Sequence, residues 1–140
     1  MKKNYAYCQV AFKILLEKSG KFLFLTDSKK GHLDLPGGRA DEDESRKPLE
    51  KIINREVREE LGSKIKYRLG EPIFQNRRYY PKKKTYVWIT VYKAKYVSGP
   101  IKLSFEHSKY QWIDPKKYNF KEKDFFNKEE YGAFKKYFKK

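Results

Sequence analysis

The sequence has 140 residues, of which 34 are Lys or Arg and 18 are Asp or Glu, so its formal net charge is +16. This length predicts one domain, 1–140, that buries about two thirds of the surface of the unfolded chain. The single cysteine, Cys8, excludes an intramolecular disulfide and favours a reducing compartment, so we expect a cytoplasmic protein. Its apolar surroundings favour a buried Cys8. No secretory signal or membrane contact is predicted, because Gln9, Lys13 and Glu17 interrupt the apolar residues near the start of the chain.

The first half of the chain predicts a hairpin, a short strand and a helix. Residues 10–16 and 22–26 are rich in β-branched and aromatic residues and flank a turn that contains glycine, as the strands of a hairpin do. A short strand over 33–35 ends at a proline. The helix is predicted over 48–61, and Gly62 occupies the favoured position just past its end.

The second half predicts further strands and one more helix. The expected strands cover 64–68, 73–80, 85–96, 101–103 and 110–113. The last helix is expected within 125–138. Strands, a helix, more strands and a helix are typical of an α+β fold in which helices cover a mixed sheet.

One face of the predicted helix over 48–61 begins apolar and ends acidic. This stripe consists of Leu49, Ile52, Ile53, Glu56 and Glu60, with Glu59 at its edge. Clustered carboxylates repel one another, and a cation, protons or water must relieve that repulsion. Carboxylate oxygens suit Mg²⁺ or Mn²⁺, and Arg55 can orient Glu59 across one turn. The alternative is a solvated charged surface. The preceding Gly37-Gly38 turn and the apolar start of the stripe favour the metal site.

These residues resemble the box of the Nudix hydrolases, G-x5-E-x7-R-E-U-x-E-E-x-G-U with U aliphatic. The matching positions are Gly38, Glu44, Arg55, Glu56, Val57, Glu59, Glu60 and Gly62. Two departures stand out, because ten residues rather than seven separate Glu44 from Arg55, and Ser63 replaces an aliphatic residue. We expect the three extra residues to lie before the helix, where Ser45 and Pro48 offer a cap and a first-turn proline.

The resemblance implies an α/β/α sandwich that hydrolyses a phosphoanhydride bond with Mg²⁺ or Mn²⁺. The implied substrate is a nucleoside diphosphate linked to another moiety, such as a nucleotide or a dinucleoside polyphosphate. The implied metal ligands are Glu56, Glu59, Glu60 and the Gly38 carbonyl. The catalytic candidates are Glu59, Glu60, Glu106 and Arg55, the last of which would hold the carboxylates in register. Glu106 belongs to a segment, 106–112, that resembles a late strand of the family.

Substrate contacts are predicted at Arg39, Arg78 and Tyr80. Tyr80 follows Ser63 by seventeen residues, a spacing similar to that of the diadenosine polyphosphate hydrolases of the family. The ADP-ribose hydrolases would instead have proline where this chain has Arg78. His107 follows Glu106 at the start of a strand, which favours a structural histidine.

The basic charge predicts a polyanionic partner, either a nucleotide, a polyphosphate or RNA. A basic cluster, Arg77-Arg78 with Lys82 to Lys84, surrounds Tyr79-Tyr80, and aromatic rings among cations suit base stacking. The alternative is a solvated, lysine-rich loop. Two other functions therefore remain open: an RNA 5′-end pyrophosphohydrolase, and a non-catalytic basic nucleic-acid-binding module on the same fold. The presence of all three box glutamates favours an enzyme, and the oligomeric state stays open.

Overall fold

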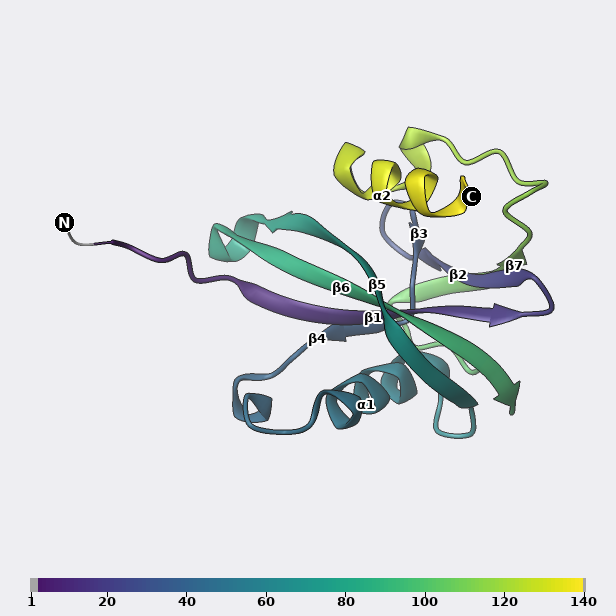
Figure 1. The fold of residues 1–140 in the computed structure, drawn as a ribbon, viewed down its shortest axis with the longest axis horizontal. Coiled ribbons are helices and arrows are strands. Elements are labelled where there is room, and N and C mark those ends of the chain that lie inside the picture. Colours follow the sequence, from purple (N-terminus) through teal and green to yellow (C-terminus); the bar gives the residue numbers. More distant parts are fainter. Residues whose placement is uncertain (1–2, 140) are drawn as a thin grey trace.

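The computed structural model describes residues 3–139, in which seven strands form one sheet and two α-helices cover it (Figure 1). The strands are β1 (Gln9–Lys18), β2 (Lys21–Asp27), β3 (Leu33–Asp34), β4 (Gly37–Arg39), β5 (Lys66–Tyr80), β6 (Thr85–Ser98) and β7 (His107–Ile113). The helices are α1 (Leu49–Leu61) and α2 (Lys128–Phe138), and the 3-10 turns are η1 (Glu42–Glu44), η2 (Pro81–Lys83) and η3 (Glu122–Asp124).

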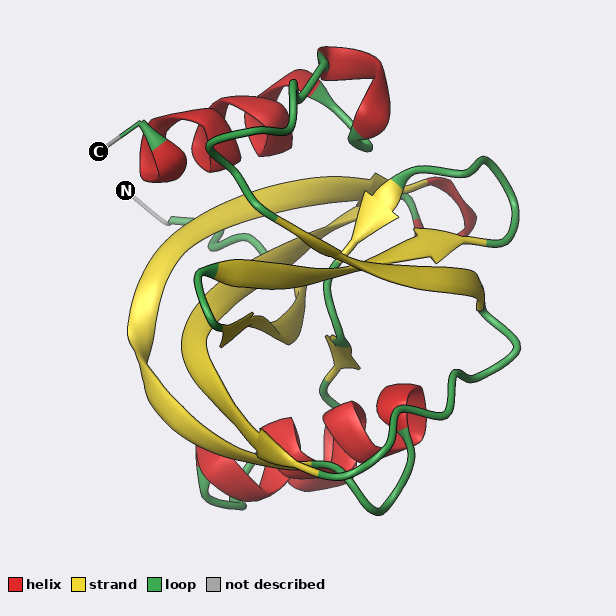
Figure 2. Ribbon diagram, turned by 90° about the vertical axis from the view of Figure 1, so that its right-hand side faces the viewer, coloured by secondary structure: helices red, strands yellow, loops and turns green. Residues whose placement is uncertain are grey.

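The sheet is mixed and lies between the two helices. Its main path runs β3-β2-β1-β6-β5, while β4 pairs with β1 and β7 pairs with β2. β1 and β6 are parallel, whereas the other pairs are antiparallel. Figure 2 shows α1 and α2 on opposite sides of the curved sheet. The predicted α/β/α sandwich with a mixed sheet is therefore confirmed.

A buried apolar cluster lies between each helix and the sheet. On β1, Ile14 and Leu16 pack with Ile53 and Val57 of α1, while Leu15 belongs to the cluster on the α2 side. Successive side chains of a strand point to opposite faces, so a strand buried on both faces has a nearly continuous apolar run. Such a run fixes β1 in the middle of the molecule, beside both helices.

Two segments of the chain differ from their predicted secondary structure. The separate strands predicted over 64–68 and 73–80 are one long strand, β5, which begins at Lys66 and whose register shifts around Pro72. Residues 101–103 do not form the predicted strand. The backbone N–H groups of Lys102 and Ser104 instead donate to the carbonyls of Leu61 and Glu60, over 2.8 and 3.2 Å. This segment therefore satisfies the free carbonyls at the end of α1.

The predicted burial of Cys8 is wrong, and the apolar stripe of α1 is not buried along its whole length. Cys8 is exposed, because it precedes β1 and no layer covers it. Leu49 is half exposed, because it begins α1 before the helix reaches the sheet. Neither α-helix of residues 3–139 is long and apolar enough to cross a bilayer.

The loop before α1 takes up the three-residue expansion. η1 ends at Glu44, and α1 begins at Leu49 with Pro48 at its N-cap position. The predicted bulge before the helix is thus confirmed. Ser45 is not the cap of α1, because its hydroxyl donates to the Glu42 carbonyl over 2.8 Å. Gly62 ends the helix with a φ of 92°, as predicted.

Candidate active site

Arg55 joins three carboxylates at the start of the acidic half of α1. Its Nε and Nη2 donate to the two oxygens of Glu44, over 2.7 and 2.5 Å. Nη2 also donates to Glu56 over 2.7 Å, and Nη1 donates to Glu59 over 2.6 Å. The predicted pairing of Arg55 with Glu59 is confirmed. These bonds fix the carboxylates relative to one another.

Glu44 anchors the acidic loop to α1. Its carboxylate accepts from Arg55 and from the Asp41 backbone N–H, the latter over 2.8 Å. The hydrogen bonds from Arg55 are the main reason why the pKa of Glu44 falls to about 2. The sequence did not determine where Glu44 lies, because the loop after it is expanded. In the structure its carboxylate lies against the Arg55 guanidinium.

Glu56 lies against the Gly37-Gly38 segment. A Cβ added to Gly38 would lie 2.2 Å from Oε2 of Glu56, so only glycine leaves room for this carboxylate. Gly37 is constrained by the backbone, since its φ is 129° and an added Cβ would lie 2.1 Å from the Phe12 carbonyl oxygen. Burial raises the pKa of Glu56, although Arg55 opposes the shift. β4 and α1 thus meet at a carboxylate.

The contact at Gly38 gives a first prediction. We expect Gly38→Ala to fold, because the obstructing atoms belong to the end of a flexible side chain. The displaced Glu56 should lower metal-dependent turnover at least roughly 10-fold, since small misplacements of catalytic groups are costly. Gly132→Ala in α2 is the control, because an added Cβ there meets no atom within 4 Å. Equal turnover of the wild type and Gly38→Ala would contradict this reading.

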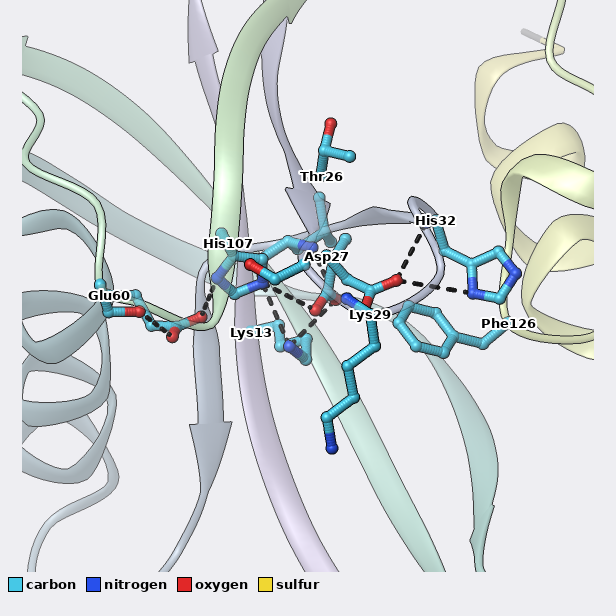
Figure 3. Close-up of polar contacts among 12 residues, drawn as sticks. Lys13, Thr26, Asp27, Lys29, His32, Glu60, His107 and Phe126 are labelled. Atoms are coloured by element: carbon cyan, nitrogen blue, oxygen red, sulfur yellow. Dashed lines mark hydrogen bonds and ion pairs between the residues drawn. The ribbon is translucent and has the colours of Figure 1, made fainter.

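Glu60 lies one turn beyond Glu56, facing β7 (Figure 3). Its Oε1 lies 3.5 Å from Nδ1 of His107, and its Oε2 accepts from the Ser104 hydroxyl over 3.2 Å. Burial raises the pKa of Glu60 to about 7, although Lys13 and His107 act in the opposite direction. A side-chain hydrogen bond in which the protonated Glu60 donates to the exposed Glu106 raises this pKa further. The structure therefore brings two of the predicted catalytic glutamates together.

The raised pKa of Glu60 predicts how stability varies with pH in the metal-free protein. Between pH 4.5 and about 7 the folded state binds more protons at Glu60 than the unfolded state does. The free energy of unfolding due to this group therefore falls as the pH rises through that window. Urea unfolding of the wild type and Glu60→Gln from pH 4.5 to 8 measures it. As the pH rises, the free energy of unfolding of the wild type should fall relative to that of Glu60→Gln. A difference between the two proteins that does not change with pH would refute the raised pKa.

A buried ionic network behind the carboxylates was not predicted. Asp34 of β3 accepts from Arg78 Nη2 over 2.9 Å, pairs with Lys13 Nζ over 3.1 Å and contacts His107 Nε2 over 3.2 Å. Burial alone would raise the pKa of Asp34, but Arg78, Lys13 and His107 hold it well below its usual value. The network connects β1, β3, β5 and β7 beneath Glu60.

The three predicted substrate residues occupy different environments. Arg78 is partly buried, bonds Asp34 and Glu130, and has its guanidinium 3.6 Å from the centre of the Phe126 ring. Arg39 is exposed, and its guanidinium lies 4.6 Å from the centre of the Tyr80 ring. A hydrogen bond from Arg39 is the main cause of the lowered pKa of Tyr80. Arg39 and Tyr80 are thus brought together, while Arg78 serves the ionic network.

A family model of the NUDIX domain matches residues 8–134. The chain belongs to the NUDIX family. Among solved structures, the MutT protein from Methanosarcina mazei Go1 is similar, with a TM-score of 0.70 and 27% identity over 92% of this chain and 91% of that chain. The MutT NUDIX hydrolase from Burkholderia pseudomallei has a TM-score of 0.67 and 20% identity, and the match covers 83% of this chain and 90% of that chain. An ADP-ribose pyrophosphatase from Streptococcus suis 89-1591 has a TM-score of 0.60 and 15% identity, and the match covers 80% of this chain and 78% of that chain.

A comparison with curated proteins found no match. The predicted enzyme class, a Nudix pyrophosphohydrolase, is confirmed at the level of the family.

The carboxylate oxygens of the NUDIX box are of the kind that divalent metals prefer, but in this structure they do not point to one common position. Within residues 3–139, no three Asp, Glu, His or Cys side chains lie close enough together to hold a metal ion. The Arg55 guanidinium instead neutralises Glu56 and Glu59. The carboxylate oxygens and the space left by Gly38 nevertheless fit Mg²⁺ or Mn²⁺. A metal ion at this place would compete with Arg55 for the exposed carboxylate of Glu59.

Proposed function

We propose that this NUDIX protein hydrolyses a phosphoanhydride bond in a nucleoside diphosphate linked to another moiety, with Mg²⁺ or Mn²⁺ as cofactor. The observation that supports the proposal most is the contact between Gly38 and the buried Glu56 carboxylate, beside the acidic end of α1. Glu56, Glu59, Glu60 and the Gly38 carbonyl would hold the metal. When bound, such an ion neutralises phosphate charge and acidifies a water molecule.

The side chains around this site have complementary roles in the proposed reaction. Arg55 holds Glu56 in place while Glu44 holds Arg55, and it holds Glu59 as long as no metal is bound. A water oxygen forms a bond to phosphorus, the bridging P–O bond breaks, and a carboxylate takes the proton of the water. Glu60 is a candidate for this last role if it does not hold the metal, since its pKa in the metal-free protein, about 7, lies near neutral pH. Glu59 and the neighbouring Glu106 are the other candidates for the base.

We assign the substrate side of the site to Arg39 and Tyr80. Arg39 follows Gly38 directly, and its guanidinium is suited to a phosphate. The Tyr80 ring beside it is suited to stacking on a base. Arg78 acts on this side indirectly, since it fixes Asp34 below the site. The single cysteine favours a cytoplasmic setting for the reaction.

A substrate screen tests the proposal. Dinucleoside polyphosphates, nucleotide sugars, nucleoside triphosphates and RNA with a 5′-triphosphate are incubated with the protein, and the products are separated by anion exchange. We expect cleavage with Mg²⁺ or Mn²⁺ that EDTA abolishes and added metal restores. Failure to cleave any of them, by protein that remains folded, would overturn the proposal.

A second candidate is an RNA 5′-end pyrophosphohydrolase, which the net charge of +16 favours. Its activity on RNA would fall steeply as salt is added, because each neutralised phosphate releases counterions. A small nucleotide touches fewer cations, so its cleavage should depend less on salt. The third candidate, a non-catalytic binding module, would bind RNA equally well after loss of the box carboxylates.

A further inference from the structure

The end of the β5–β6 hairpin carries a cluster of exposed aromatic rings. In the antiparallel register, Arg77 lies opposite Trp88 and Tyr79 lies opposite Tyr86. Tyr79 and Tyr86 meet edge to face with ring centres 5.3 Å apart. The Arg77 guanidinium lies 5.7 Å from the Tyr86 ring and 5.5 Å from the Trp88 ring. These four side chains form one connected surface, which we call the β5–β6 aromatic patch.

This patch is open to solvent. Tyr79, Tyr86 and Trp88 are 52%, 49% and 43% exposed. The N-terminal segment passes nearby, where the Tyr7 carbonyl accepts from the Thr85 hydroxyl, but Tyr7 itself is 95% exposed. In Figure 1 this end of the hairpin extends past both helices. Large exposed apolar surfaces of this kind mark interaction sites.

The surroundings of the patch are cationic. Lys82, Lys83 and Lys84 follow Pro81 at the tip of the hairpin, and all three are exposed. Arg77 remains 46% exposed although it pairs with Glu129. Flat aromatic faces flanked by cations bind unpaired bases and phosphates together. A folded duplex offers phosphates but no free base faces.

The patch lies on the same face of the sheet as the acidic site. Tyr92, four residues after Trp88, packs in the cluster on the α1 side, so alternation puts Trp88 on that side too. Gly38 pairs with Phe12, and Phe12 pairs with Thr90. At the usual strand spacing and rise, roughly 12 Å separates the backbones of Gly38 and Trp88.

We propose that the β5–β6 aromatic patch, with Lys82 to Lys84, is a binding site for single-stranded nucleic acid. Bases stack on Trp88, Tyr86 and Tyr79, and the phosphates meet Arg77 and the lysines. The site is separate from the Arg39 and Tyr80 pair and does not depend on hydrolysis.

Fluorescence anisotropy with labelled 12-nucleotide strands tests the aromatic part of the site. RNA and DNA single strands and a duplex of the same sequence are titrated in EDTA, which separates binding from turnover. We expect Trp88→Ala and Tyr79→Ala each to weaken single-strand binding about 10-fold, the scale of one lost stacking contact. Tyr110→Ala on β7 is the control, because Tyr110 is as exposed as Trp88. Single strands should bind more tightly than the duplex.

Salt dependence tests the cationic part. Lys82→Gln with Lys83→Gln should lower the slope of log K against log salt by about 1.4, since each phosphate contact to a single strand contributes about 0.7. Lys116→Gln with Lys117→Gln, in the exposed loop after β7, is the control of equal charge. Equal effects of both pairs, or unchanged binding by Trp88→Ala and Tyr79→Ala, would overturn the proposal and leave only nonspecific attraction by the net charge.

Discussion

Replacing Glu59 or Glu60 by glutamine is expected to lower metal-dependent turnover at least roughly 10²-fold. Each substitution keeps the shape of the side chain but removes a negative charge, so a metal ligand or a base is lost. For Glu60 the loss includes the group whose pKa burial raises to about 7. Steady-state rates on the best substrate of the screen measure the effect, and circular dichroism checks that the fold persists.

The control for these variants is Glu50→Gln, which lies in the first turn of the same helix, away from the acidic end. Its turnover should match that of the wild type. Near wild-type turnover in both Glu59→Gln and Glu60→Gln would show that the catalytic site has been assigned to the wrong carboxylates.

Asp34→Ala should destabilise the fold by about 3–5 kcal/mol, the usual cost of removing one partner from a buried ion pair. The variant leaves the charges of Lys13 and Arg78 without the carboxylate that lies 3.1 and 2.9 Å from them. It also removes the acceptor for the Leu35 backbone N–H. The midpoint and slope of urea unfolding give the change in the free energy of unfolding.

Asp43→Ala is the matched control for this measurement, because Asp43 is exposed in η1. It should change stability by less than about 0.5 kcal/mol, as surface substitutions usually do. A loss below about 1 kcal/mol in Asp34→Ala would mean that water or Glu130 neutralises the remaining cations.

Sequence patterns predicted the elements that depend on residues close together in the chain. The helical period placed α1, and the spacing of four residues predicted the bond between Arg55 and Glu59. β4 was missed because its Gly37-Gly38 sequence has little strand propensity, and it forms only by pairing with β1. Residues 101–103 were misassigned because the carbonyls of α1 compete for their N–H groups.

The ionic network could not be predicted from spacing, because its partners are distant in the sequence. Asp34 and His107 are 73 residues apart, and Asp34 and Arg78 are 44 apart. Only the folded sheet brings such residues together. Glu56, Glu59 and Glu60 were predictable because they follow one another along one helix, whereas the contact of Glu60 with Glu106 is tertiary.

The parallel pairing of β1 with β6 has a consequence for synthesis on the ribosome. Gln9 pairs with Val87, 78 residues later, so β1 emerges long before its neighbour exists. At a translation speed of about 5–20 residues per second, that interval lasts roughly 4–16 s. During this time β2 and β4 can pair with the residues on either side of Ile14, Leu15 and Leu16, whose own ladder partners lie in β6. The nascent chain therefore exposes an unpaired edge of its central strand, and a holding chaperone that recognises apolar strands should bind it in that interval.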